Sequence, residues 1–270
     1  RELAEALDLK PSKSLGQNFV HDGNVCRKIV RTAGLTETDV ALEIGPGLGS
    51  LTLAMMEVAQ AVVAVEIDSR LATQLPITAA KHSERADILT VINQDALTLK
   101  DLPVAPTVLI ANLPYNVSVP VLLTILERFP SITSGVVMVQ TEVAERLAAK
   151  PGNKTYGVPS AKAAWWCEMT LADSVSRSVF WPVPNVDSSL VRFVRHEPLG
   201  DEKLRERTFE LIDRAFGQRR KMLRAIYSDI YGGSSEAEQA LSAAGIEPTI
   251  RGESLSVESF AALANHLIER

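Results

Sequence analysis

The stretch Val40-Ala41-Leu42-Glu43-Ile44-Gly45-Pro46-Gly47-Leu48-Gly49 decides the fold that the sequence predicts. Its first five residues are apolar apart from Glu43, as in a strand covered on both faces, and a G-x-G-x-G turn follows. A helical pattern begins directly afterwards at Leu51. Glycines at a helix N-terminus let a ligand approach the backbone closely. A tight strand-helix turn without a ligand is the alternative for this segment.

The alternation of strand and helix patterns continues to about residue 140. Strand patterns cover residues 62–67, 88–92, 108–111 and 136–139, and helical patterns cover residues 51–58, 70–80 and 121–128. Repeated units of this kind predict an α/β fold, a Rossmann-like, doubly wound, mostly parallel sheet with its ligand at the carboxyl edge. An apolar strand at 190–194 closes this domain, which we predict at residues 1–196. Helix-spaced apolar residues then predict a small all-helical domain at residues 197–270.

Two acidic residues stand at the ends of successive predicted strands. The Glu66 carboxylate could accept hydrogen bonds from both hydroxyls of a ribose, and Asp95 could accept one from an adenine amine. Each acid alone fits a solvated residue at a strand end equally well. A nicotinamide dehydrogenase is a competing class, but its third glycine would stand where this chain has Ser50. The loop and the two acids together predict a site for S-adenosylmethionine.

Residues Asn112-Leu113-Pro114-Tyr115 directly follow the predicted strand at 108–111. The exocyclic amine of adenine is a poor nucleophile, so an enzyme that alkylates it has to hold it by hydrogen bonds. An Asn amide oxygen and a neighbouring carbonyl accept both amine hydrogens, Pro stiffens that carbonyl, and Tyr offers a stacking face. The alternative is a strand followed by a Pro turn with a half-buried Tyr.

The composition indicates an ordinary globular chain. It has 270 residues, 46% of them hydrophobic and 23% charged, with a net charge of −5. No apolar stretch approaches the roughly 18 residues that span a bilayer, and no signal-peptide pattern is present in the given sequence. Cys26 and Cys167 lie far apart without metal-ligand spacing, so we expect both to be buried and the chain to be cytoplasmic.

Five ordered motifs make the chain resemble the ribosomal RNA adenine N6-dimethyltransferase family over almost its whole length. They are the Gly-rich loop, the tetrad at 112–115, Ser14-Leu15-Gly16-Gln17-Asn18-Phe19, Phe180-Trp181-Pro182-Val183-Pro184-Asn185-Val186-Asp187-Ser188, and Ala215-Phe216-Gly217-Gln218-Arg219-Arg220-Lys221. The Gly-rich loop and the last motif favour the family branch that acts on 16S RNA. This resemblance implies N6,N6-dimethylation of two adjacent adenosines in the 3′-terminal hairpin of 16S rRNA, within an immature small ribosomal subunit.

The resemblance also implies residue roles. S-adenosylmethionine would be held by Gln17, Asn18, Val20, Gly45, Gly47, Glu66, Asp95 and Asn112. The target adenine would be held by Asn112, Leu113, Pro114, Tyr115 and Phe180, the two aromatic rings stacking on the flipped base. A core aromatic before a Pro-rich turn is the alternative for Phe180. The sulfonium already carries an activated methyl group, so neither a metal nor a covalent intermediate is expected.

RNA binding has to come from local charge, because the overall balance is acidic. A basic cluster near the start of the helical domain is the candidate RNA surface, with phosphate contacts from Arg219, Arg220, Lys221 and Arg224 and a further cation at Arg214. A solvated helix face is the alternative for this cluster. The expected partner is RNA rather than a membrane, and the protein is expected to be a monomer.

Three positions depart from the family pattern. Val119 stands where Ser or Thr is common, Thr141 replaces a usual Lys, and Pro159 replaces a common Leu. A macrolide-resistance type methyltransferase acting on large-subunit RNA shares most of the motifs and remains an alternative. A non-catalytic RNA-binding descendant, a transcription factor or an assembly factor is the third class, although the intact tetrad and acids favour activity.

Overall fold

The computed structural model describes residues 11–12 and 16–268 of the chain. The chain divides into two compact units, Arg1–Ala144 with Met169–Arg195 and Glu145–Glu168 with His196–Arg270. Within the described ranges, no helix is both long and apolar enough to cross a membrane. Both cysteines, Cys26 and Cys167, are free and buried as expected.

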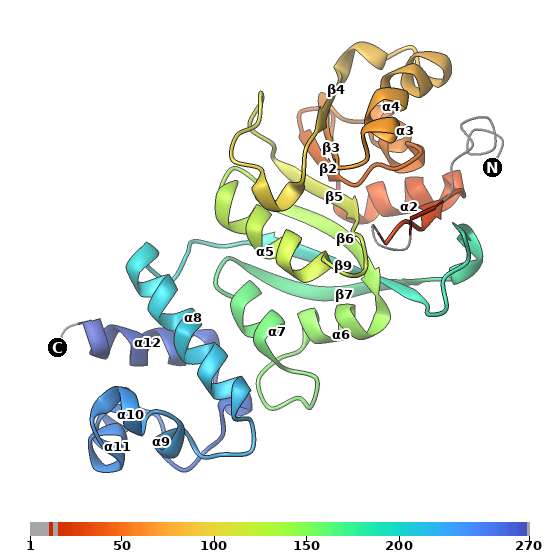
Figure 1. Cartoon of the computed structure of the whole chain (residues 1–270). Coiled ribbons are helices and arrows are strands. Elements are labelled where there is room, and N and C mark those ends of the chain that lie inside the picture. Colours follow the sequence, from red (N-terminus) through yellow and green to blue (C-terminus); the bar gives the residue numbers. More distant parts are fainter. Residues whose placement is uncertain (1–10, 13–15, 269–270) are drawn as a thin grey trace. The chain divides into compact units, whose positions relative to one another are not determined.

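A seven-stranded sheet forms the centre of the first unit in the described part of the chain. Its order is β4-β3-β2-β5-β6-β9-β7 (Figure 1). Strands β2 to β6 are parallel to their neighbours in this order, and β9 runs antiparallel to β6. The predicted doubly wound, mostly parallel sheet is therefore confirmed. The strands are β2 (Val40–Ile44), β3 (Ala61–Glu66), β4 (Leu89–Asn93), β5 (Val108–Asn112), β6 (Ser134–Gln140), β7 (Cys167–Val175) and β9 (Ser188–Arg195).

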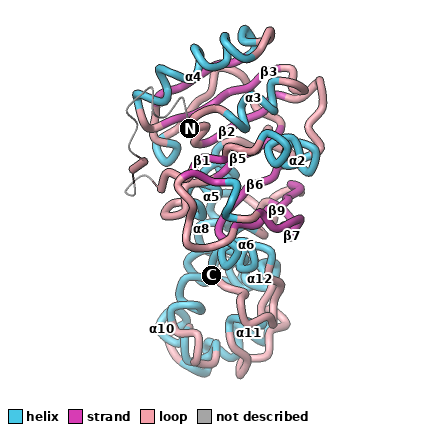
Figure 2. Tube along the Cα trace, turned by 90° about the vertical axis from the view of Figure 1, so that its right-hand side faces the viewer, coloured by secondary structure: helices cyan, strands magenta, loops and turns pink. Residues whose placement is uncertain are grey.

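Helices cover both faces of this sheet, which explains the continuous apolar character of its central strands. One face packs against α2 and α3, where Ile29 and Met55 share a buried cluster with Ala41, Val62 and Ile110. Figures 1 and 2 show α5 on the opposite face. The helices of this unit are α2 (Gly23–Ala33), α3 (Ser50–Met56), α4 (Ser69–His82) and α5 (Ser118–Arg128), with short 3₁₀ turns η1 (Ala86–Ile88), η2 (Ala96–Thr98) and η3 (Arg177–Val179). Helix α6 (Thr141–Ala148) begins in this unit and ends in the second.

A small antiparallel two-stranded sheet joins two segments that the sequence pattern did not predict as strands. Strand β1 (Phe19–Val20) pairs with β8 (Phe180–Trp181), and the pairs are Phe19 with Trp181 and Val20 with Phe180. The rings of Phe19 and Trp181 stack with centroids 6.1 Å apart. This two-stranded sheet thus fixes the N-terminal motif against the Pro-rich motif that lies about 160 residues later.

The second unit is helical. Residues 145–168 belong to it because the rings of Trp165 and Trp166 pack edge-on against Phe209, with centroids 6.1 and 5.4 Å away. The sequence pattern placed those residues in the first predicted domain, at 1–196, and the predicted boundary after residue 196 stays a prediction. The elements are α7 (Val158–Ala163), α8 (Glu202–Gly217), α9 (Leu223–Ile226), α10 (Ser228–Tyr231), α11 (Ser234–Ala243), η4 (Gly252–Ser254) and α12 (Val257–Ile268).

Candidate active site

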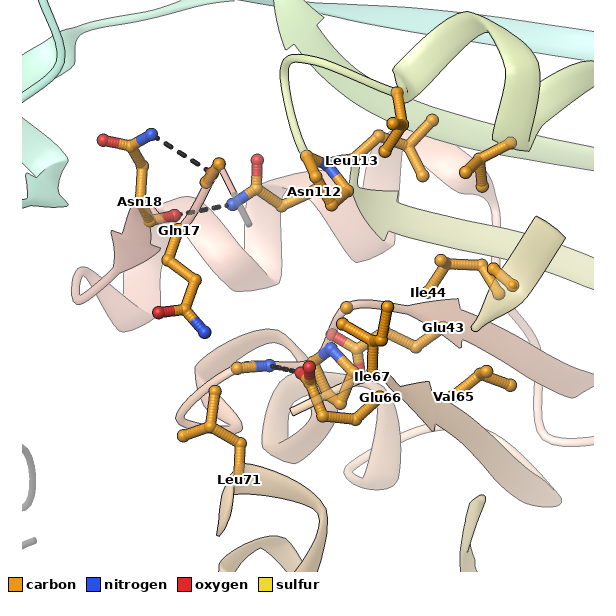
Figure 3. A pocket seen from close by; sticks show the side chains of 18 of the residues that line it. Gln17, Asn18, Glu43, Ile44, Val65, Glu66, Ile67, Leu71, Asn112 and Leu113 are labelled. Carbon is orange, nitrogen blue, oxygen red and sulfur yellow. Dashed lines mark hydrogen bonds between the residues drawn. The ribbon is translucent and has the colours of Figure 1, made fainter. Parts of the chain in front are cut away.

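A cavity of about 260 Å³ lies in the first unit, at the carboxyl ends of β2, β3 and β5. It is lined by residues from segments 16–20, 43–51, 65–71, 94–97 and 112–121. Figure 3 shows side chains of these segments converging on one space. The structure brings together the predicted cofactor-binding residues and the tetrad, namely Gln17, Asn18, Val20, Gly45, Gly47, Glu66, Asp95, Asn112, Leu113, Pro114 and Tyr115.

The Gly-rich loop needs glycine for two different reasons. Gly45 and Gly47 have φ of +70° and +56°, where side chains other than glycine are strained. A Cβ on Gly45 would lie 3.8 Å from the Pro114 ring and would fill space between the loop and the tetrad. A Cβ on Gly47 would lie 2.7 Å from the ring of Phe19, which is too close. Gly45 therefore keeps the cavity open, and Gly47 lets β1 pack on the loop.

Glu66 ends β3 with its carboxylate in the cavity wall. Its Oε2 accepts a hydrogen bond from the Gly47 amide at 3.1 Å (Figure 3). Its Oε1 accepts a hydrogen bond from the Asp68 amide at 2.9 Å. Burial raises the pKa of Glu66, while both of these hydrogen bonds lower it. Each carboxylate oxygen has a lone pair left for a further donor. The group can therefore bind a pair of ligand hydroxyls.

Glu43 is a second carboxyl in the same cavity, and the sequence pattern assigned it no role. It lies in β2 with 1% of its surface exposed, and its Oε2 accepts a hydrogen bond from Thr52 Oγ1 at 2.5 Å. Burial raises the pKa of Glu43 to about 8; the Thr52 hydrogen bond lowers it, and the charge of Glu66 raises it. The carboxyl is therefore mostly protonated at neutral pH. The sequence feature that could have identified Glu43 as a cavity residue is its position as the single acidic residue within an apolar strand.

The Asn112 side chain is oriented by the N-terminal segment. Its Nδ2 donates a hydrogen bond to the main-chain oxygen of Asn18 at 3.0 Å (Figure 3). That carbonyl can only accept, so the amide nitrogen has to face it. The Asn112 Oδ1 is left as an acceptor in the cavity wall. An acceptor with a fixed direction is what the binding of an exocyclic amine requires.

The other predicted cofactor residues are also held in place. Gln17 Nε2 donates to the Asp68 carboxylate at 3.2 Å, and Val20 is buried. Asp95 caps η2 by accepting from the Leu97 amide at 2.9 Å. Ser14 and Leu15 of the N-terminal motif lie outside the described residues.

A comparison with protein families accounts for a Gly-rich loop, acidic residues and an Asn-Leu-Pro-Tyr tetrad at one cavity. The model of the ribosomal RNA adenine dimethylase family matches residues 9–269. The chain belongs to the ribosomal RNA adenine dimethylase family. The predicted class, an S-adenosylmethionine-dependent methyltransferase, is thereby confirmed.

Relatives of this adenine dimethylase match it over nearly its full length. A ribosomal RNA small subunit methyltransferase A from Leifsonia xyli is 57% identical and that from Streptomyces griseus is 56% identical; the matches cover 98% of this chain and 95% and 92% of those proteins. A solved structure of a Plasmodium falciparum dimethyladenosine transferase is similar, with TM-score 0.78 and 25% identity; the match covers 91% of this chain and 95% of that one. The structure of the 23S rRNA methyltransferase ErmE is also similar, with TM-score 0.70 and 27% identity; the match covers 93% of this chain and 99% of that one.

Phe180 of the adenine dimethylase does not line the cavity. Pairing of β8 with β1 turns its ring into the core cluster beneath α2 and α3, where 1% of its surface is exposed. In this conformation the ring cannot stack on a flipped base, and the alternative of a core aromatic describes its position. Tyr115 lines the cavity and is half-buried, so its ring is available for stacking.

Several apolar cavity residues were not expected from the sequence. Ile67 was predicted as the last residue of a strand, but β3 ends at Glu66 and leaves the Ile67 side chain 50% exposed in the cavity wall. Leu97 reaches the wall from η2. Apolar side chains in this wall suit a flat ring such as adenine. An apolar residue directly after Glu66 was the signal.

The basic cluster of the second unit is largely paired. Arg219 donates to Glu253 at 2.8 Å and to the Lys154 carbonyl at 2.8 Å, and Arg224 pairs with Glu238. Arg214 pairs with Asp229 and Glu210. Among the described residues, the exposed cations of the cluster without an ion pair are Arg220 and Lys221. These two side chains carry the uncompensated positive charge of the cluster.

Proposed function

We propose that this adenine dimethylase transfers methyl groups from S-adenosylmethionine to the N6 amines of two adjacent adenosines in the 3′-terminal hairpin of 16S rRNA. The product is N6,N6-dimethyladenosine, formed within an immature small ribosomal subunit. One observation carries the proposal: the Asn112 amide, oriented by Asn18, lines the same cavity as the Glu66 carboxylate. An acceptor for an amine and an acceptor for ribose hydroxyls thus share one site.

The cavity residues fit S-adenosylmethionine. The two oxygens of Glu66 suit the ribose hydroxyls, Ile67 and Asp95 suit the face and the amine of its adenine, and Gln17 suits its methionine end. The space that a Cβ on Gly45 would fill lies between the loop and the tetrad, where the ligand has to approach the backbone. When bound, the cofactor supplies a methyl group activated by a sulfonium.

The tetrad positions the target amine. Asn112 Oδ1 accepts one amine hydrogen and the Leu113 carbonyl accepts the other, while Pro114 limits movement of that carbonyl. Tyr115 stacks on the base. Because a monomethylated amine keeps one hydrogen, the same acceptors hold it for the second transfer. Catalysis then rests on positioning and on exclusion of water from the cavity, and the amine proton passes to solvent.

Choice of RNA is supported by the relatives. The proteins at 56% and 57% identity are named for the small subunit, whereas ErmE, named for 23S rRNA, is 27% identical. We place the RNA phosphates against Arg220 and Lys221, with Arg219 and Arg224 at the edges of that surface. The buried free cysteines support action in the reducing cytoplasm, and we propose that the protein works as a monomer without a metal.

The test is transfer of labelled methyl groups to isolated ribosomal subunits that lack adenine methylation. Label in the small subunit alone is expected. Label in the large subunit would move the chain to the resistance branch of the family, and an absence of label in both would favour a binding role. Naked 16S RNA serves as a third substrate, because recognition is expected to need the shape of the assembled particle.

A further inference from the structure

The hydroxyl of Tyr115 is held by a serine from a distant part of the chain. Tyr115 Oη and Ser188 Oγ are 2.8 Å apart. Ser188 begins β9 and is fully buried. Among the hydrogen bonds of the described residues, this is the one that its side chain makes. A buried hydroxyl with one partner fixes that partner firmly, because the alternative is an unsatisfied polar group.

The residues around Ser188 are themselves tied down. The amide and the hydroxyl of Thr141 both donate to the Asp187 carbonyl, at 3.0 and 3.1 Å, and Thr141 Oγ1 lies 2.9 Å from Ser189 Oγ. The Arg177 amide donates to the Asp187 carboxylate at 3.3 Å. Thr141 stands where the family usually has Lys, so in this chain that position supports the start of β9. The support then reaches Tyr115 through Ser188.

Tyr115 itself sits at the boundary between the cavity and the core. Tyr115 lines the cavity and is half-buried, while its hydroxyl reaches Ser188. Burial raises the pKa of Tyr115; the Ser188 hydrogen bond lowers it, and the charge of Asp187 raises it. The phenol stays neutral at physiological pH and keeps its hydrogen bond. Without that bond, the ring could turn about its side-chain torsions and lose its orientation in the cavity.

We propose that Ser188 is a positioning residue that holds the Tyr115 ring in the orientation that stacks on the target adenine, with Thr141 fixing Ser188 in turn. This inference rests on the proposed function, because it assigns the base to the Tyr115 face of the cavity. The cofactor side, around Glu66, shares no hydrogen bond with Ser188 among the described residues. Loss of the Ser188 hydroxyl should therefore affect the base and spare the cofactor.

A double-mutant cycle tests the proposal. The variants are Ser188→Ala, Tyr115→Phe and the double variant. Ser160→Ala is the matched control, because Ser160 is also buried and its hydroxyl donates to the Arg146 carbonyl, away from Thr141 and Tyr115. The readouts are kcat and KM for small subunits, and calorimetric affinity for S-adenosylhomocysteine. A third is the affinity of the S-adenosylhomocysteine complex for adenosine 5′-monophosphate. Thermal unfolding reports whether each variant is folded.

Ser188→Ala should lower kcat/KM and the affinity for adenosine monophosphate by about tenfold, with affinity for S-adenosylhomocysteine within twofold of wild type. In the Tyr115→Phe background the same substitution should change neither. Equal losses in both backgrounds, or a loss of affinity for S-adenosylhomocysteine, would overturn the proposal.

A second variant guards against misfolding. If Ser188→Ala does not fold, Thr141→Val replaces it, with the same dependence on the Tyr115 hydroxyl expected at a smaller size; an equal effect in the Tyr115→Phe background would again overturn the proposal. If the wild-type protein binds adenosine monophosphate but methylates no subunit, the proposed function alone is refuted. The double-mutant cycle is then evaluated from the affinities for adenosine monophosphate. A wild type that does neither overturns both.

Discussion

Asn112 Nδ2 donates to the main-chain oxygen of Asn18 at 3.0 Å, which joins the end of β5 to the N-terminal motif 94 residues earlier. This hydrogen bond fixes which end of the amide faces the cavity. It also links two motifs that are far apart in sequence. In the proposed function, one supplies the acceptor for the amine and the other sets its direction.

Asn112→Ala should abolish most transfer while it preserves cofactor binding. The substitution removes the oriented acceptor, and loss of one such polar contact to a reacting group costs about 100-fold or more in kcat. Glu66 and Asp95 are unchanged, so affinity for S-adenosylmethionine should fall less than tenfold. Single-turnover transfer and calorimetry measure the two quantities separately. Normal turnover by this variant would refute the role of the tetrad.

Gly47→Ala should reduce both stability and cofactor affinity. The new Cβ would lie 2.7 Å from the Phe19 ring, on a backbone with φ of +56°. Strain alone costs about 1–2 kcal/mol, and displacement of β1 should weaken S-adenosylmethionine binding more than tenfold. Gly34→Ala is the control, because it has φ of +71° but no atom within 4 Å of the added Cβ. That control should lose stability and keep its affinity.

Glu43 should make the stability of the protein fall as pH rises. The pKa of Glu43 is about 8 in the folded protein, and its ordinary value, expected in the unfolded chain, is 4.5. At a pH between these two values, the folded state therefore binds more protons than the unfolded state. The free energy of unfolding then decreases by about 1.4 kcal/mol per pH unit. Relative to Glu43→Gln, wild type should lose about 2 kcal/mol between about pH 6 and about pH 7.5. Urea unfolding measures this difference, and a difference that does not change with pH would contradict it.

Arg220→Ala with Lys221→Ala should weaken RNA binding, and the slope of log affinity against log salt should fall by about one to two. Arg219→Ala should act mainly on stability, by about 0.5–1 kcal/mol, because its guanidinium is engaged by Glu253 and Lys154. Lys81→Ala with Lys203→Ala removes the same charge elsewhere and is the control. Binding titrations at several salt concentrations would show an unchanged slope if this surface were not the RNA site.

The central strands of the sheet follow closely from local sequence. β2 covers the predicted residues 40–44, because both faces are buried and the apolar run shows it directly. β7 was not predicted, because it lies at the sheet edge and most of its side chains are exposed, which removes the apolar signal. The pairing of β1 with β8 joins segments about 160 residues apart and has no local signature.

In the candidate site, too, some features were predicted from the sequence and others appear only in the folded structure. Glu66 and Asp95 were predicted from their places at strand ends, and Asn112 was predicted from the chemistry of its tetrad. The structure places all three at one cavity. The burial of Phe180 depends on which way the β8 strand faces after it pairs with β1, and composition does not encode that direction. Arg219 and Arg224 form salt bridges with Glu253 and Glu238, and these partners are known only from the folded structure.

In the proposed function, the acceptor at Asn112 directs methyl groups to the N6 amine of adenine. Mass spectrometry of nucleosides from unmethylated small subunits, after reaction with wild type and with Asn112→Ala, tests it most directly. Wild type should yield N6,N6-dimethyladenosine in 16S rRNA, and Asn112→Ala should yield little or none. Methyl groups on another atom or another base, or equal dimethylation by the two proteins, would contradict the account.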